Sequence, residues 1–133
     1  MTSFVRPLHL LSLAAVLTVA GCVKAPIEGR GETYSAAQVN FVDSDLRAKT
    51  AVDRPIVSRD ENGILRVTVP VRAATDEQLS IDYRTTFVDK NGQIVETQTW
   101  MNKTLNPNVF ERIEATCSSP KAADFEMDLR YER

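Results

Sequence analysis

The feature that most constrains this chain is a strict alternation of apolar and charged side chains near its C-terminus. From Ala123 to Glu132 the odd positions hold Ala, Phe, Met, Leu and Tyr, and the even positions hold Asp, Glu, Asp, Arg and Glu. Successive side chains of a β-strand point to opposite faces of a sheet. The segment therefore predicts a strand with one buried face and one solvated face.

The same two-residue period recurs upstream, and turn residues separate the runs. Leu65–Ala73 and Leu79–Val88 both alternate, and Asn91-Gly92 after the second run is a strong hairpin signal. Pro70 cannot donate to a ladder, so we expect a free side or a bulge beside it. Further strands are expected at Val39–Val42, Ile56–Val57, Gln93–Thr97 and Val109–Cys117, and a helical turn capped by Ser44 at Ser44–Lys49. About six to eight strands without a long helical period predict an all-β, antiparallel β-sandwich.

The N-terminus carries a different kind of signal. Arg6 precedes an apolar stretch from Leu8 to Ala20, whose 13 residues are too few to cross a bilayer core but suit a secretory signal peptide. The sequence Val19-Ala20-Gly21-Cys22 is similar to the lipobox of bacterial lipoproteins, in which the cysteine thiol takes up a diacylglycerol. We therefore expect a signal peptide at 1–21, a lipidated N-terminus and flexible tether at 22–38, and one sandwich domain at 39–133.

The residue after the lipidated cysteine bears on location. Val23 stands where an inner-membrane retention signal of enterobacterial lipoproteins has Asp. The chain is therefore expected at the outer membrane, attached to the membrane through its lipid and facing the periplasm. A flexible coil of the tether's length reaches only roughly 20–24 Å, so the domain should stay near the bilayer.

Composition excludes several classes of function. The only histidine, His9, lies in the signal peptide, so the mature chain has no histidine for acid–base catalysis, for a catalytic triad or for a zinc site. Cys117 is the only cysteine besides Cys22, so no disulfide is expected within the domain. The net charge of −2 does not suggest nucleic acid as a partner. We expect no catalytic residue, no metal site and no cofactor, and thus no enzyme.

Three residues have both a structural and a functional interpretation within the predicted strands and turns. Cys117 lies on an apolar face and is expected to be a buried hydrophobe; the alternative is a reactive thiol. Asp89 precedes the Asn91-Gly92 turn and is expected to accept turn amides; the alternative is a contact with a cation or a partner. Tyr83, like Phe87, is expected in the core rather than on a ligand platform.

Arg84 and Trp100 are the two remaining candidates for binding. If Leu65–Ala74 and Leu79–Val88 form a hairpin, Arg84 lies near Arg66 and Arg72, and such a cluster could bind an acidic partner or a lipopolysaccharide phosphate. The alternative is cross-strand ion pairing with Asp82, Asp124, Glu126 or Asp128. Trp100, the sole tryptophan, is expected to plug the sandwich; the alternative is an exposed ring that stacks on sugars or anchors a partner.

Several motifs together resemble the YcfL-like lipoproteins, a bacterial family of unknown function. The residues that carry the resemblance are Asn62–Val67, Tyr83-Arg84-x-x-Phe87-x-Asp89-x-Asn91-Gly92, Trp100, Leu105 and Ala122–Phe125, and the signal and lipobox also match the family's layout. The resemblance implies an immunoglobulin-like sandwich and no known activity, cofactor or catalytic residue. Genes of this family can lie beside one for an outer-membrane activator of a peptidoglycan synthase, which implies a role at the cell wall.

These observations lead to one expected function and two alternatives. The expected function is a non-catalytic binding or assembly module that presents a surface to another envelope or cell-wall protein. The first alternative is a binder of a small ligand or of a glycan such as peptidoglycan, which would use Trp100 and the loop Asn106–Asn108. The second is an enzyme that works with carboxylates alone. No small-molecule ligand can be named from the sequence.

Overall fold

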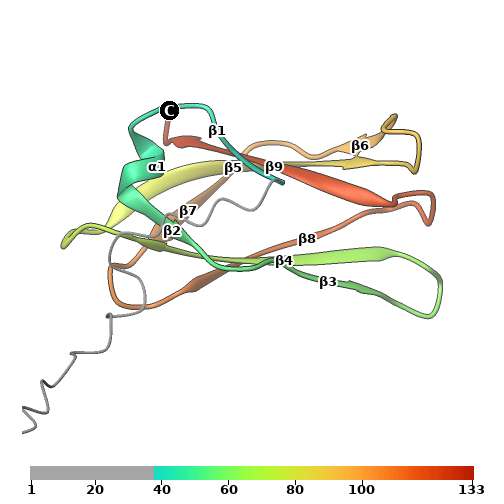
Figure 1. Cartoon of the computed structure of the whole chain (residues 1–133), viewed down its shortest axis with the longest axis horizontal. Coiled ribbons are helices and arrows are strands. Elements are labelled where there is room, and N and C mark those ends of the chain that lie inside the picture. The colour runs from blue at the N-terminus through green and yellow to red at the C-terminus, as the bar shows by residue number, and fades with distance from the viewer. Residues whose placement is uncertain (1–37) are drawn as a thin grey trace, which may run out of the picture.

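A computed structural model describes residues 38–133, so the predicted signal peptide, Cys22 and all but the last residue of the predicted tether lie outside the described residues. The described residues form two β-sheets packed face to face (Figure 1). The β5 sheet contains β1 (Val39–Phe41), β9 (Asp124–Tyr131), β5 (Leu79–Val88), β6 (Ile94–Thr97) and β7 (Met101–Leu105). The β4 sheet contains β2 (Thr50–Val52), β3 (Ile56–Arg59), β4 (Leu65–Ala73) and β8 (Glu111–Thr116). The expected all-β sandwich is confirmed.

Each sheet is built around one long central strand. β5 pairs with β9 on one side, and its other side pairs with β7 along its first half and with β6 along its second half. β4 pairs with β8 on one side and with β2 and β3 on the other. β4 and β5 therefore lie in different sheets, and the hairpin considered for Leu65–Ala74 and Leu79–Val88 does not form. The alternation marks both strands correctly but carries no information about which sheet each one joins.

One strand pair departs from the antiparallel expectation. β1 runs parallel to β9, with Val39 beside Met127 and Phe41 beside Leu129. After β1 the chain turns through the short helix α1 (Leu46–Lys49) and enters the β4 sheet. The N-cap of this helix is Asp45, so the cap expected at Ser44 is wrong.

Two edges are each shared by two strands, β2 with β3 and β6 with β7, and one extra edge residue lies where the two strands meet. The β5–β6 pair has a further irregularity between Phe87 and Val88. Between the pairs Val52–Val71 and Ile56–Thr68, three edge residues face two residues of β4. The bulge lies at Pro70, whose carbonyl oxygen accepts the amide of Asp53 at 2.9 Å. Because proline has no N–H to offer the neighbouring strand, the ladder is interrupted there, as the sequence predicts.

The core lies between the two sheets and follows the predicted alternation. Fully buried side chains come from α1 and from both sheets, among them Leu46, Val67, Val69, Val71, Ile81, Phe87, Leu105, Ile113, Phe125, Met127 and Leu129. Tyr83 is half-buried against this core, as expected. Val109 is wrong as a core residue, because β8 begins at Glu111 and leaves Val109 in a loop with 58% of its surface exposed.

Candidate functional site

The second bulge decides where Trp100 lies. Thr86 pairs with Thr97, and Tyr83 pairs with Met101, so two residues of β5 face the three residues 98–100 of the edge. The bulge begins where the amide of Gln98 donates to the carbonyl oxygen of Thr85 at 2.8 Å. An extra residue in one strand re-aims the side chains beside it. Trp100 is therefore not a core plug, and it is absent from the buried core among residues 38–133.

Two arginines stack on the ring of Trp100. The guanidinium carbon of Arg130 lies 3.8 Å from the ring centroid, and that of Arg84 lies 4.6 Å from it. Trp100 is half-buried in this arrangement. Cation–π contacts of this kind hold a ring in place and occupy the face that a sugar would need. The glycan-binding alternative for Trp100 stays a prediction, and a sugar would have to compete with these arginines for the ring.

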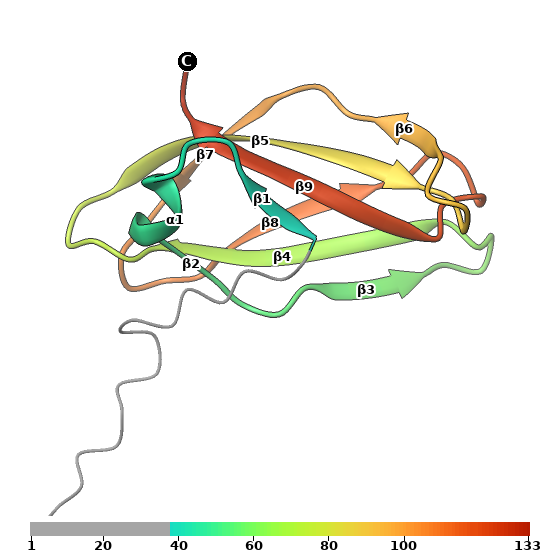
Figure 2. The same cartoon turned by 45° about the horizontal axis from the view of Figure 1, so that its top comes forward.

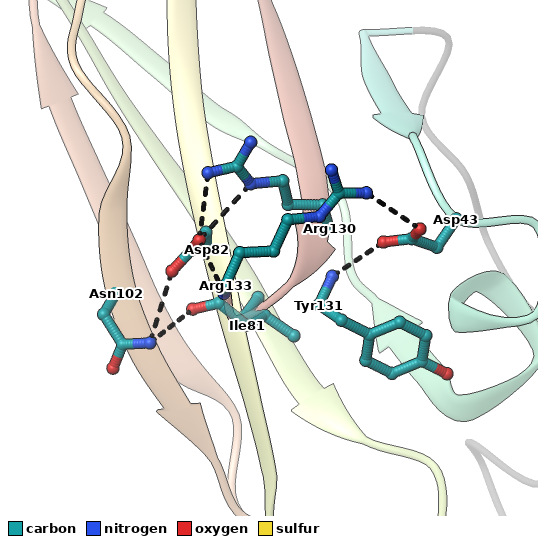
Figure 3. A network of polar contacts seen from close by, with 7 residues as sticks. All are labelled: Asp43, Ile81, Asp82, Asn102, Arg130, Tyr131 and Arg133. Atoms are coloured by element: carbon teal, nitrogen blue, oxygen red, sulfur yellow. Dashed lines mark hydrogen bonds and ion pairs between the residues drawn. The ribbon is translucent and has the colours of Figure 1, made fainter.

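Asp82 is the centre of the polar network beside this stack (Figure 3). Asp82 is 7% exposed, and its carboxylate accepts from Arg130 Nε and Nη2, at 3.3 and 3.2 Å, and from Asn102 Nδ2 at 3.4 Å. Burial by itself raises the pKa of Asp82, but the hydrogen bonds from Asn102 and Arg130 outweigh it and hold the pKa below its usual value. The sequence identifies Asp82 only as one possible ion-pair partner; its position opposite Arg130 in the register is what selects it.

The C-terminal residues extend this network toward α1. The backbone amide of Arg133 lies 3.4 Å from Asp82, and its guanidinium lies 3.5 Å from Asp43 (Figure 3). Asp43 also accepts the amide of Tyr131 at 2.9 Å, and the Tyr131 hydroxyl donates to Asp45 at 2.8 Å. The last residues of the chain are thus fastened to the segment between β1 and α1.

Arg84 forms an ion pair and does not join the predicted cluster with Arg66 and Arg72. Its Nη2 lies 2.8 Å from Asp128 Oδ2, so the ion-pair interpretation of Arg84 is confirmed. Arg66 and Arg72 belong to β4, in the other sheet, which overturns the predicted cluster. Arg66 pairs instead with Asp60 at 3.4 Å.

Asp89 is a turn residue, as its structural interpretation predicts. Its Oδ1 accepts the amides of Asn91 and Gln93, at 2.8 and 3.0 Å, and Gly92 has φ +78°. The turn before β4 repeats this pattern, since Asp60 Oδ1 accepts the amides of Asn62 and Ile64 and Gly63 also has φ +78°. Both turns have the sequence Asp-x-Asn-Gly, so this local motif specifies the geometry twice.

Cys117 is buried at the seam between the sheets, as expected. It is 1% exposed, and burial raises the pKa of its thiol, which disfavours the reactive thiolate. Beside it, Glu96 of β6 accepts the amide of Ser118 at 2.7 Å and the Ser118 hydroxyl. These hydrogen bonds from Ser118 lower the pKa of Glu96. Glu96 could not be identified from the sequence, because its partner is 22 residues away.

Three further features of the described residues bear on the site, namely metal ligands, helices able to cross a bilayer and a surface depression. Residues 38–133 contain no group of three or more His, Cys, Asp and Glu side chains able to hold a metal ion. Over the same range, no helix has both the length and the hydropathy that crossing a bilayer requires. An open depression of about 430 Å³ lies at the turn end of the sandwich, lined by Arg59, Asp89, Lys90 and residues 120–123. Arg59 spans this end by donating to the carbonyl oxygens of Gly63 and Ala122.

Comparison with known proteins agrees with this fold. A family model described as protein of unknown function (DUF1425) matches residues 37–131. The crystal structure of Campylobacter jejuni cj0090 is similar at a TM-score of 0.63 and 17% identity, covering 73% of this chain and 100% of that chain. A DUF1425 family member from Shewanella sp. pv-4 is similar at a TM-score of 0.56 and 20% identity, covering 63% of this chain and 79% of that one. A comparison with curated protein sequences gave no match. At these identities the structural likeness shows the fold alone, and the narrower YcfL-like assignment stays a prediction.

Proposed function

The chain belongs to the DUF1425 family of unknown function, and from that premise we propose that it is a lipid-anchored, non-catalytic binding module of the cell envelope. In this proposal Cys22 carries the lipid, and the sandwich faces the periplasm from the outer membrane. The apolar stretch, the lipobox-like Val19–Cys22 and Val23 support the anchor and its location.

The candidate residues form contacts within the fold, and this supports a binding role over a catalytic one. Asp82, Asp89, Arg84 and Trp100 all have partners within the fold. A general acid, base or nucleophile needs a group within reach of a substrate, in a suitable protonation state. These side chains instead hold strands and turns in place, so the outer surfaces are left to interact with other molecules.

One surface has the composition of a protein interface, and this observation carries the proposal. We define the Phe110 patch as Arg72, Val109, Phe110 and Arg112, where β4 ends and β8 begins. Val109 and Phe110 are 58% and 42% exposed, and the guanidinium of Arg72 lies 5.4 Å from the centroid of the Phe110 ring. Aromatic residues and arginine are enriched in interfaces, and arginine pairs with carboxylates through a planar fork.

Charge identifies the kind of partner that this patch fits. Arg112 is exposed and forms no ion pair within residues 38–133. On the outer face of the β5 sheet, by contrast, Arg84 and Arg130 are neutralised by Asp128 and Asp82. The Phe110 patch is therefore proposed to dock an envelope protein whose surface has carboxylates around an apolar centre.

Anchoring can be tested with two substitutions in the full chain. Cys22→Ala should abolish incorporation of labelled palmitate and release the protein from membranes. Val23→Asp should leave lipidation intact but retain the protein in the inner membrane. Unchanged labelling and membrane fractionation of Cys22→Ala would refute the anchor.

Docking can be tested by photo-crosslinking in intact cells. A photoreactive residue at Val109 should give one discrete adduct, while the same residue at Ile94, which is 70% exposed on β6, should not. Arg112→Glu should abolish the adduct, and charge reversal of the partner's carboxylates should restore it. Equal adducts from positions 94 and 109, or an adduct insensitive to Arg112→Glu, would contradict docking through the patch.

A further inference from the structure

β3 is an unprotected edge of the β4 sheet. Within the described residues it pairs only with β4, and Figure 2 shows it at the margin of the sandwich. The opposite edge of the same sheet is bridged to the β5 sheet, because Gln98 donates to Thr116 and Lys103 lies 3.7 Å from Glu111. Open edges of this kind are templates for pairing with another chain.

The backbone of β3 has hydrogen-bonding groups to offer. Asp60 donates its amide to Ile64 across the β3–β4 ladder, and Ser58 lies opposite Arg66 in the same register. In antiparallel pairs, residues facing the partner strand alternate with residues facing away from it. The N–H and C=O groups of Val57 and Arg59 therefore point to the open side of the strand.

Two of the four side chains of β3 are apolar and exposed to solvent. All four residues of the strand are exposed, and Ile56 and Val57 expose 61% and 50% of their surface. Edge strands that avoid pairing typically carry lysine or an inward-pointing charge. Neither interrupts Ile56–Ser58. The charge of the strand is Arg59 at its end, which donates to the carbonyl oxygens of Gly63 and Ala122, and Pro55 limits the length of any ladder.

The order of charges along this edge selects the partner. Arg54 precedes β3, and Asp60 and Glu61 follow it. If two copies pair antiparallel, Arg54 of each approaches the Asp60–Glu61 turn of the other; if they pair in parallel, like charges meet. Neither Arg54 nor Glu61 has an ion-pair partner within residues 38–133.

We propose that β3 pairs antiparallel with β3 of a second copy of this chain, which joins the two β4 sheets into one. The contact is isologous, so each copy offers the same edge and the assembly closes as a dimer. Ile56 and Val57 lose solvent exposure in it, and the charged ends contribute two symmetric cross-strand contacts. This inference goes beyond the proposed function and needs neither the lipid nor a docked partner.

Disulfide cross-linking of the full chain in native membranes tests the contact. Ser58→Cys lies at the middle of the paired edge, whereas Ile94→Cys is an exposed control on the other sheet. The native Cys117 is buried, so the unsubstituted chain reports the background. Mild oxidation should give a dimer band for Ser58→Cys, many-fold stronger than for Ile94→Cys. Equal bands for the two variants, or none, would overturn the proposal.

Charge exchange distinguishes a second copy from any other partner. In the Ser58→Cys background, Arg54→Glu and Glu61→Arg should each reduce the dimer band several-fold. The double variant should restore it, because the ion pairs re-form with reversed polarity. Single variants without effect, or a double variant that fails to recover, would count against pairing between two copies. Unchanged membrane attachment of Cys22→Ala, with cross-linking retained, would refute the anchor alone.

Discussion

Arg130 contacts Trp100 and Asp82 at once, with its guanidinium carbon 3.8 Å from the ring centroid and its Nη2 3.2 Å from the carboxylate. The arginine comes from β9, the tryptophan from the bulge between β6 and β7, and the aspartate from β5. One side chain of the last strand therefore fixes the position of the ring on the outer face of the β5 sheet.

Removing this side chain should be more disruptive than removing an exposed cation. Arg130→Ala leaves the largely buried Asp82 carboxylate without its charged partner and takes one stacking group from Trp100. We expect a lower midpoint of urea unfolding and a red-shifted tryptophan emission in the native state. Lys49→Ala is the matched control, since the Lys49–Asp45 pair is exposed and should contribute nothing measurable. Equal midpoints for the two variants would contradict the role of Arg130.

Thr85 provides an opportunity to stabilise the fold. Its side chain is 0% exposed, and its hydroxyl oxygen has no hydrogen-bond partner within residues 38–133. Thr85→Val keeps the shape and removes a buried unsatisfied polar group, so it should raise the free energy of unfolding by about 1 kcal/mol. Thr86→Val removes a hydroxyl that contacts Thr97 and should bring no such gain. Chemical denaturation of the two variants makes the comparison; a destabilised Thr85→Val would show that the hydroxyl is satisfied.

Glu96 should make stability depend on pH. Its hydrogen bonds from Ser118 lower its pKa in the folded state from the ordinary value of 4.5. The contribution to stability is therefore present above 4.5 and is lost as the pH falls through the folded-state pKa. Glu96→Gln should be less stable than the natural chain at about pH 7, and the gap should narrow toward about pH 3. Glu126→Gln, at an exposed position of β9, is the control; a gap that stays constant with pH would argue against this assignment.

The turn before β6 should depend on one glycine. Gly92 has φ +78°, and a Cβ at this position would meet no atom within 4 Å. Gly92→Ala should therefore cost about 1 kcal/mol through backbone strain alone. Asn tolerates this conformation better, so Gly92→Asn should cost less in the same denaturation experiment. Equal losses would indicate that the side chain, and not the backbone angle, is responsible.

The local sequence pattern predicted where the strands lie better than it predicted which strands pair with one another. Alternation identified β4, β5 and β9, and the Asp-x-Asn-Gly motif gave the role of Asp89, because both signals act within a few residues. The outer-face position of Trp100 could not be predicted, because it depends on the bulge at residues 98–100, which forms only when β6 and β7 pair with β5. The sheet assignment of β4 and β5, and with it the surroundings of Arg84, also depends on contacts between distant segments.

The parallel pair of β1 and β9 has a consequence for how the domain assembles. Val39 and Phe41 find their strand partners only in Met127 and Leu129, almost at the end of the chain. Synthesis delivers the N-terminal end first, so β1 must wait until β9 has been made before its ladder can close. Contacts between such distant positions slow folding, and a truncated chain that lacks β9 leaves both β1 and β5 with an open side. Pairing of β1 can therefore occur only after β9 is present.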